Sequence, residues 1–187
     1  MTRNAPLILT SLALLALVAI SAMAFAPPGI LLWFSLGLGA LLVALSMIDL
    51  RTLTLPDPLN LAVFALGALM VWQTRPDAWP HHLIGAFAGY TLLVMVEITY
   101  RRMRGRDGLG RGDAKLLGAL GMWTGWAGLA PIMLVASVCG LLAVGILSLT
   151  GRRTFDSTSA IAFGPFIALG GWIVWLGADY LLPAGLY

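Results

Sequence analysis

The segment ILLWFSLGLGALLVALSMID, from Ile30 to Asp49, is the clearest indication of the fold class of this chain. It runs without a charge until its last residue, and a helix that crosses a bilayer needs about 20 apolar residues. The whole chain is 60% hydrophobic and only 10% charged, whereas soluble domains carry roughly 25% charged residues. We therefore expect an all-α, polytopic transmembrane helix bundle.

Further apolar segments are separated by turn sequences such as Pro27-Pro28-Gly29. They cover Leu7–Ala26, Leu59–Trp72, His82–Tyr100, Asp113–Trp123, Ala127–Leu149 and Ala160–Ala178. The segment that starts at Asp113 is short and glycines follow it, so we expect a half-length helix that turns into the next one. The prediction is six to seven helices, with a first helix and turn in 1–29 and one membrane domain in 30–187.

The basic residues predict the orientation of these helices. Threading them in alternation from a cytoplasmic N-terminus places ten of the eleven Lys and Arg residues on the cytoplasmic side, and only Arg75 on the other. Cytoplasmic loops of membrane proteins carry such an excess of Lys and Arg. The positive charge therefore indicates topology in a bacterial inner membrane and gives no reason to expect nucleic acid as a partner.

The first segment has a second interpretation. Arg3, an apolar run and Ala22-Met23-Ala24 also fit a signal peptide with a small-residue cleavage site. The run is long enough to span a bilayer, and Pro27-Pro28 makes a poor mature N-terminus. We favour an uncleaved first helix.

Asp49 and Asp113 each stand at the edge of an apolar segment, and the predicted threading places both at cytoplasmic helix ends. An ionisable group at the hydrocarbon boundary is costly, which makes it a candidate functional residue. Two carboxylates that lie close together cannot both ionise cheaply, so the pKa of one should rise. The pair could then share acid and base roles in hydrolysis. For Asp113, helix capping is an equally good interpretation, because Gly112-Asp113 precedes an apolar run.

The remaining polar residues have simpler interpretations. Asp57, in Leu55-Pro56-Asp57-Pro58, suits a turn or a helix cap better than catalysis. Glu97 stands four residues before Arg101, which favours a local ion pair. His81 and His82 fall on the far side of the membrane, and Cys139 is the only cysteine. We therefore expect neither a disulfide, nor a metal site, nor a cofactor.

Three ordered motifs resemble one known family. Its signature GxGD is matched by RGRDGLGRGDAKLLGALG, from Arg104 to Gly121. Its first aspartate motif is matched by Met47-Ile48-Asp49-Leu50-Arg51 with Leu55-Pro56-Asp57. Its FGPF segment is matched by Ala162-Phe163-Gly164-Pro165-Phe166. On these motifs the chain resembles the type IV prepilin peptidases.

The resemblance implies an aspartic membrane protease that removes the basic leader of a prepilin or pseudopilin by cutting after a glycine. By motif match, Asp49 and Asp113 carry over as the catalytic pair. Gly110 and Gly112 would leave room for a substrate backbone, while Lys115 and Asp57 match motif positions without an assigned catalytic role. Many members also carry a cytoplasmic domain with paired CxxC motifs and N-methylate the new terminus; this chain looks like a short form without that domain.

Two other classes of function stay open at this point. A proton-coupled transporter would also use paired aspartates, although no acid continues their path across the membrane. A non-catalytic assembly subunit would tolerate loss of both. We also expect the helices that carry Asp49 and Asp113 to pack together, and the loop Tyr100–Gly112 to be mobile and to cover part of the site. The substrate pilin and the oligomeric state do not follow from the sequence.

Overall fold

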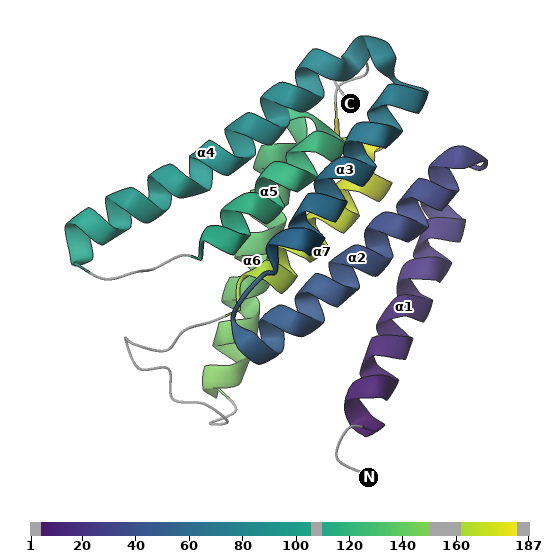
Figure 1. The fold of residues 1–187 in the computed structure, drawn as a ribbon. Coiled ribbons are helices and arrows are strands. Elements are labelled where there is room, and N and C mark those ends of the chain that lie inside the picture. The colour runs from purple at the N-terminus through teal and green to yellow at the C-terminus, as the bar shows by residue number, and fades with distance from the viewer. Residues whose placement is uncertain (1–4, 106–109, 150–161, 183–187) are drawn as a thin grey trace.

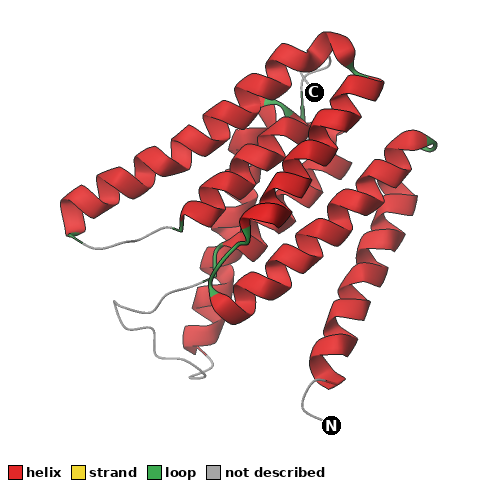
Figure 2. Ribbon diagram, viewed as in Figure 1, coloured by secondary structure: helices red, strands yellow, loops and turns green. Residues whose placement is uncertain are grey.

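The computed structural model describes residues 5–105, 110–149 and 162–182, and these form helices joined by short connections (Figures 1 and 2). No strand occurs in the described residues. The elements are α1 (Ala5–Phe25), α2 (Ile30–Thr52), α3 (Asp57–Thr74), η1 (Pro76–Ala78), α4 (Trp79–Arg104), α5 (Arg111–Thr124), η2 (Trp126–Gly128), α6 (Leu129–Leu149), α7 (Gly164–Leu176) and α8 (Ala178–Leu181). The predicted all-α fold class is confirmed.

Three helical segments are long and apolar enough to cross a membrane: Ile30–Thr52, Pro76–Arg104 and Trp126–Leu149. Shorter apolar helical stretches cover Leu9–Phe25 and Gly164–Leu176. The helices that contain these stretches expose many large apolar side chains, as a lipid-facing surface requires. The chain is therefore built as a multi-pass membrane protein, and the full number of spans remains a prediction.

The short helix α5 forms the centre of the bundle. Apart from Lys115, its side chains from Asp113 to Thr124 are buried, and it packs against α3, α4 and α7. The Trp123 indole N–H donates to the Val63 carbonyl at 2.8 Å, which ties α5 to α3. At Gly125, with φ of 66°, the chain turns into η2 and α6. The predicted half-length helix that turns into the next one is confirmed.

Glycines allow α4 and α5 to approach closely. A Cβ at Gly85 would lie 2.5 Å from the carbonyl oxygen of Gly121, so no larger residue fits without a shift of the backbone. Small residues at helix contacts allow this kind of packing in membranes, where polar backbone and van der Waals contacts replace the hydrophobic effect between helices. The contact fixes the position of α5, and with it the position of Asp113.

One end of the bundle collects six of the seven Lys and Arg residues of the described chain. The C-terminal ends of α2, α4 and α6 and the N-terminal ends of α3, α5 and α7 lie together there (Figure 1). We call it the basic end; its basic residues are Arg51, Arg101, Arg102, Arg104, Arg111 and Lys115. Asp49 and Asp113 lie at this end too.

Helix α4 extends further than the sequence predicts. The fourth predicted segment stops at Tyr100, whereas α4 continues to Arg104 and ends at Gly105 in the left-handed conformation. Arginine is a good helix former and stabilises the C-terminal end of a helix dipole, so the basic run continues the helix. The predicted loop Tyr100–Gly112 is correspondingly shorter, and its central residues, 106–109, lie outside the described residues.

Candidate active site

Asp49 lies in the last turn of α2 and is 4% exposed. The backbone N–H of Gly164, at the start of α7, donates to its Oδ2 at 3.1 Å. Leu53 then ends α2 in the left-handed conformation, with φ of 54°, and its N–H bonds to the Asp49 carbonyl at 2.9 Å. The carboxylate is thus held at a point where α2 stops and α7 begins.

Gly164 has no room for a side chain. A Cβ placed on it would lie 2.7 Å from Asp49 Oδ2 and 3.1 Å from Leu55 Cδ1. Glycine therefore lets the α7 backbone come close enough to bond the carboxylate. The FGPF resemblance marked this segment, but only the fold reveals the contact with Asp49.

Asp113 lies in the first turn of α5 and is 8% exposed. It does not cap the helix. The N-cap position is Gly110, α5 has no side-chain cap hydrogen bond, and the Asp113 backbone N–H bonds to the Gly110 carbonyl at 3.1 Å. The capping interpretation is therefore wrong, and the carboxylate is not used to complete the end of the helix.

The two aspartates interact through their charges. Burial raises the pKa of Asp113 to about 7, and the negative charge of Asp49 is the second cause. Asp113 lies outside the candidate membrane spans, in a helix too short to cross a bilayer. Near neutral pH, one proton is therefore available at this pair of carboxylates.

The contact between the two aspartate-bearing helices is indirect. We expected these helices to pack together, but α2 and α5 do not form one of the main helix pairs; each packs on α3 and α7 instead. Leu55, in the link between α2 and α3, packs against the starts of α5 and α7, since a Cβ at either Gly112 or Gly164 would meet its side chain. Gly112 thus allows close packing against Leu55. Gly110 leaves the space beside Asp113 without a side chain, since a Cβ there would lie 3.5 Å from Asp113 Oδ2.

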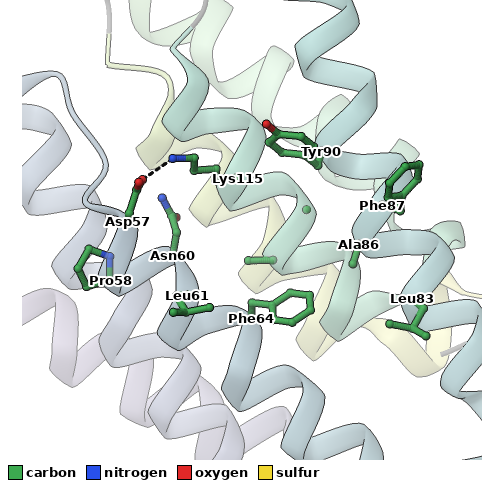
Figure 3. A pocket seen from close by; sticks show the side chains of 12 residues that line it. Asp57, Pro58, Asn60, Leu61, Phe64, Leu83, Ala86, Phe87, Tyr90 and Lys115 are labelled. Atoms are coloured by element: carbon green, nitrogen blue, oxygen red, sulfur yellow. Dashed lines mark hydrogen bonds and ion pairs between the residues drawn. The ribbon is translucent and has the colours of Figure 1, made fainter.

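Lys115 and Asp57 form an ion pair beside the site. The Lys115 Nζ lies 2.6 Å from Asp57 Oδ1, which joins the first turns of α5 and α3 (Figure 3). Asp57 is the first residue of α3, after Pro56 at the N-cap position, and makes no side-chain cap hydrogen bond. Its main partner is therefore a charge 58 residues away, which neither a turn nor a cap interpretation anticipates.

Glu97 of α4 forms ion pairs at the N-terminal end of α5. Its carboxylate is buried and lies 2.8 Å from Arg101 Nη2 and 3.4 Å from Arg111 Nε. The predicted pair with Arg101 is confirmed. The contact with Arg111 was not predicted, and it ties the N-terminus of α5 to α4.

The described residues contain no group of three His, Cys, Asp or Glu side chains placed to hold a metal ion. His82 is buried at the far end of α4, where its Nδ1 lies 2.9 Å from the Met122 carbonyl. At the basic end, the site thus combines two carboxylates and one backbone N–H donor, with the Lys115–Asp57 and Glu97–Arg ion pairs beside them. Such a set can move a proton between two acids and activate water.

The model of the type IV leader peptidase family matches residues 36–145, more than half of the chain. The chain belongs to the type IV leader peptidase family. The matched region includes Asp49, Asp57, Asp113 and Lys115, and the membership confirms the resemblance drawn from the motifs.

Curated relatives of this chain carry the name prepilin leader peptidase/N-methyltransferase. The protein of Pectobacterium carotovorum subsp. carotovorum is 39% identical over 77% of this chain and 51% of its own. That of Xanthomonas campestris pv. campestris is 39% identical over 80% and 53%, and that of Burkholderia pseudomallei strain 1026b is 41% identical over 79% and 47%. The chain thus spans about half the length of the curated relatives it matches. No solved structure matches the chain.

Proposed function

We propose that this chain is an aspartic endopeptidase that removes the basic leader of type IV prepilins or pseudopilins after a glycine. The observation that carries the proposal is the convergence of Asp49 and Asp113, which stand far apart in the sequence, on one site at the basic end. Family membership and the name of the relatives supply the substrate class.

The site supports a division of roles between the carboxylates. Asp49 Oδ2 accepts the Gly164 N–H, which needs a lone pair and no proton. Asp113 holds its proton up to a pH of about 7. In the proposed step, Asp49 takes a proton from a water whose oxygen attacks the scissile carbonyl, while Asp113 gives its proton to the carbonyl oxygen. Collapse of the tetrahedral intermediate breaks the C–N bond: the amine leaves with the proton from Asp49, and one hydroxyl of the intermediate returns its proton to Asp113, which leaves the new carboxyl group and restores both aspartates.

The distribution of charge supports a cytoplasmic site in a bacterial inner membrane. Six Lys and Arg residues of the described chain lie at the basic end, whereas Arg75 lies at the other. Under the positive-inside rule the basic end is cytoplasmic. A prepilin presents its basic leader on that side and continues into an apolar helix, so its cleavage point would lie at the depth of Asp49 and Asp113.

Replacement of either aspartate tests the proposal. We expect Asp49→Asn and Asp113→Asn each to slow cleavage of a co-expressed prepilin by about 10²–10⁴-fold, the usual contribution of acid–base catalysis. Asp77→Asn is the matched control, because Asp77 is exposed in η1 at the far end. Membrane insertion and thermal unfolding in detergent check that the variants fold.

A folded Asp49→Asn or Asp113→Asn protein that cleaves at the wild-type rate would overturn the proposed roles. Uncleaved prepilin with wild-type protein, together with proton flux into liposomes, would favour the transporter instead. N-terminal sequencing of the product reads the cut site and methylation together. We expect an unmethylated new N-terminus, because the sequence has one cysteine and no paired CxxC motifs.

A further inference from the structure

A groove runs along the outer face of α5 between α3 and α4 (Figure 3). The two flanking helices pack on α5 but make little contact with each other. Between them, the small residues Gly118 and Ala119 of α5 form the floor of the groove. The groove has a volume of about 750 Å³ and begins at the Lys115–Asp57 ion pair. Beyond the pair its walls are apolar, with Phe64 on one side and Phe87 on the other.

The dimensions of the groove suit a helix. Its lining on α3 runs from Asp57 to Phe64 and on α4 from Leu83 to Tyr90, and seven helical steps rise about 10 Å. A cylinder of that length and of helix diameter, also about 10 Å, encloses about 800 Å³. Two turns of an α-helix would therefore fill it.

Asn60 distinguishes this groove from a lipid-facing furrow. Its side chain is 4% exposed and lines the groove, yet among the described residues neither its Oδ1 nor its Nδ2 has a hydrogen-bond partner. Figure 3 shows the amide pointing towards the Lys115–Asp57 pair without bonding it. An unpaired amide away from water is costly, and lipid acyl chains cannot satisfy it. The occupant must therefore bring polar groups to an otherwise apolar wall.

The first turn of a helix supplies such groups, because its N–H groups have no partner within the helix. We propose that the groove binds the start of the apolar helix of the prepilin, just beyond the scissile bond, an inference that rests on the proposed function. Asn60 Oδ1 accepts an N–H of that first turn, and Nδ2 donates to a carbonyl of the segment before it.

The groove and the catalytic pair lie on opposite sides of α5. Lys115 follows Asp113 by two residues, which places the two side chains about 200° apart around the helix. A substrate that occupies both must cross the N-terminal end of α5, at its N-cap residue Gly110. The path across the end of a helix about 10 Å wide takes about three residues of extended chain at about 3.3 Å each, so about three residues would connect the scissile bond to the bound helix.

Photo-crosslinking tests the occupant directly. We would place p-benzoyl-phenylalanine at Leu61, which is exposed in the groove, and at Leu69, an exposed residue of α3 outside it. In an Asp113→Asn background that keeps the prepilin intact, we expect a prepilin adduct at Leu61 at least ten times stronger than at Leu69. Equal adducts at both positions, or adducts to lipid alone at Leu61, would refute the inference. Cleavage by the wild-type protein is scored separately, so failure of the groove and failure of the peptidase are distinguishable.

Two substitutions test the contacts. Ala86→Trp fills the groove, and Ala65→Trp puts the same side chain on an exposed position of α3 outside it. We expect Ala86→Trp to raise KM for intact prepilin about tenfold and to leave unchanged the cleavage of a short peptide that contains the leader and junction but no helix. Equal loss on both substrates, or no loss on either, would contradict the proposal.

Asn60→Leu separates binding from folding. The substitution removes an unpaired buried amide, so we expect a higher Tm in detergent. Loss of its hydrogen bonds to the substrate should raise KM for intact prepilin about five- to tenfold with kcat unchanged. A lower Tm, or an unchanged KM, would mean that Asn60 has a structural role only.

Discussion

The substitution Gly164→Ala tests whether the start of α7 positions Asp49. The new Cβ would lie 2.7 Å from Asp49 Oδ2, about 0.7 Å short of the 3.4 Å at which ordinary contact begins. Because α7 is anchored in the core by Ile167 and Ala168, the carboxylate rather than the helix should move. The hydrogen bond from the Gly164 N–H, now 3.1 Å long, would then weaken or break.

The expected loss of activity follows from that displacement. A hydrogen bond to a charged group contributes about 1.5–3 kcal/mol, which corresponds to about 10- to 150-fold in rate. Misplacement of a catalytic group by about 1 Å alone can cost about 10²-fold. We therefore expect kcat for prepilin cleavage to fall about 10- to 100-fold, with a much smaller change in KM.

The control for this experiment is Gly145→Ala in α6, where a new Cβ would meet nothing within 4 Å. It should keep wild-type activity and fold at least as stably, since alanine favours a helix over glycine by about 1 kcal/mol. A Gly164→Ala protein with more than half of the wild-type kcat would refute the positioning role. Restoration of activity by an added Leu55→Ala would show that crowding against Leu55, at 3.1 Å, is the cause instead.

Three further predictions concern the surroundings of the site. Because the pKa of Asp113 is raised to about 7, Asp113 loses its proton as the pH rises through that value. We therefore expect kcat/KM to fall above pH 7 and the infrared band of a protonated carboxyl to vanish over the same range; a rate that still rises at pH 8 would contradict this. Glu97→Gln removes the buried charge that joins two arginines, so we expect a loss of about 1–3 kcal/mol in unfolding free energy; an unchanged Tm would show that the pair is dispensable. Gly121→Ala would drive a Cβ into the α4 backbone at Gly85 and should cost about 1–3 kcal/mol as overpacking does, whereas Gly145→Ala should not.

Much of the architecture could be predicted because bilayer chemistry acts on local sequence. Every backbone polar group in hydrocarbon must be hydrogen-bonded within its own segment, and a helix meets this requirement for a long apolar run such as Ile30–Asp49. The short length of α5 could also be predicted from the sequence, because Gly125 ends the helix. The end of α4 was not, because the arginines beyond Tyr100 appear as a loop in hydropathy but continue the helix in the fold.

Local sequence was enough to predict a helical membrane protein with its basic residues on one side, two isolated aspartates and the motifs of the type IV leader peptidase family. These properties are local, since hydropathy, charge and motif spacing are carried by neighbouring residues. The tertiary structure alone decided that Asp113 caps nothing, that Gly164 bonds Asp49, that α2 and α5 meet through α3, α7 and Leu55, and that Asn60 faces a groove without a partner. Each of these depends on contacts between helices far apart in the chain, and in a membrane such contacts are set by shape and small residues, which hydropathy does not record.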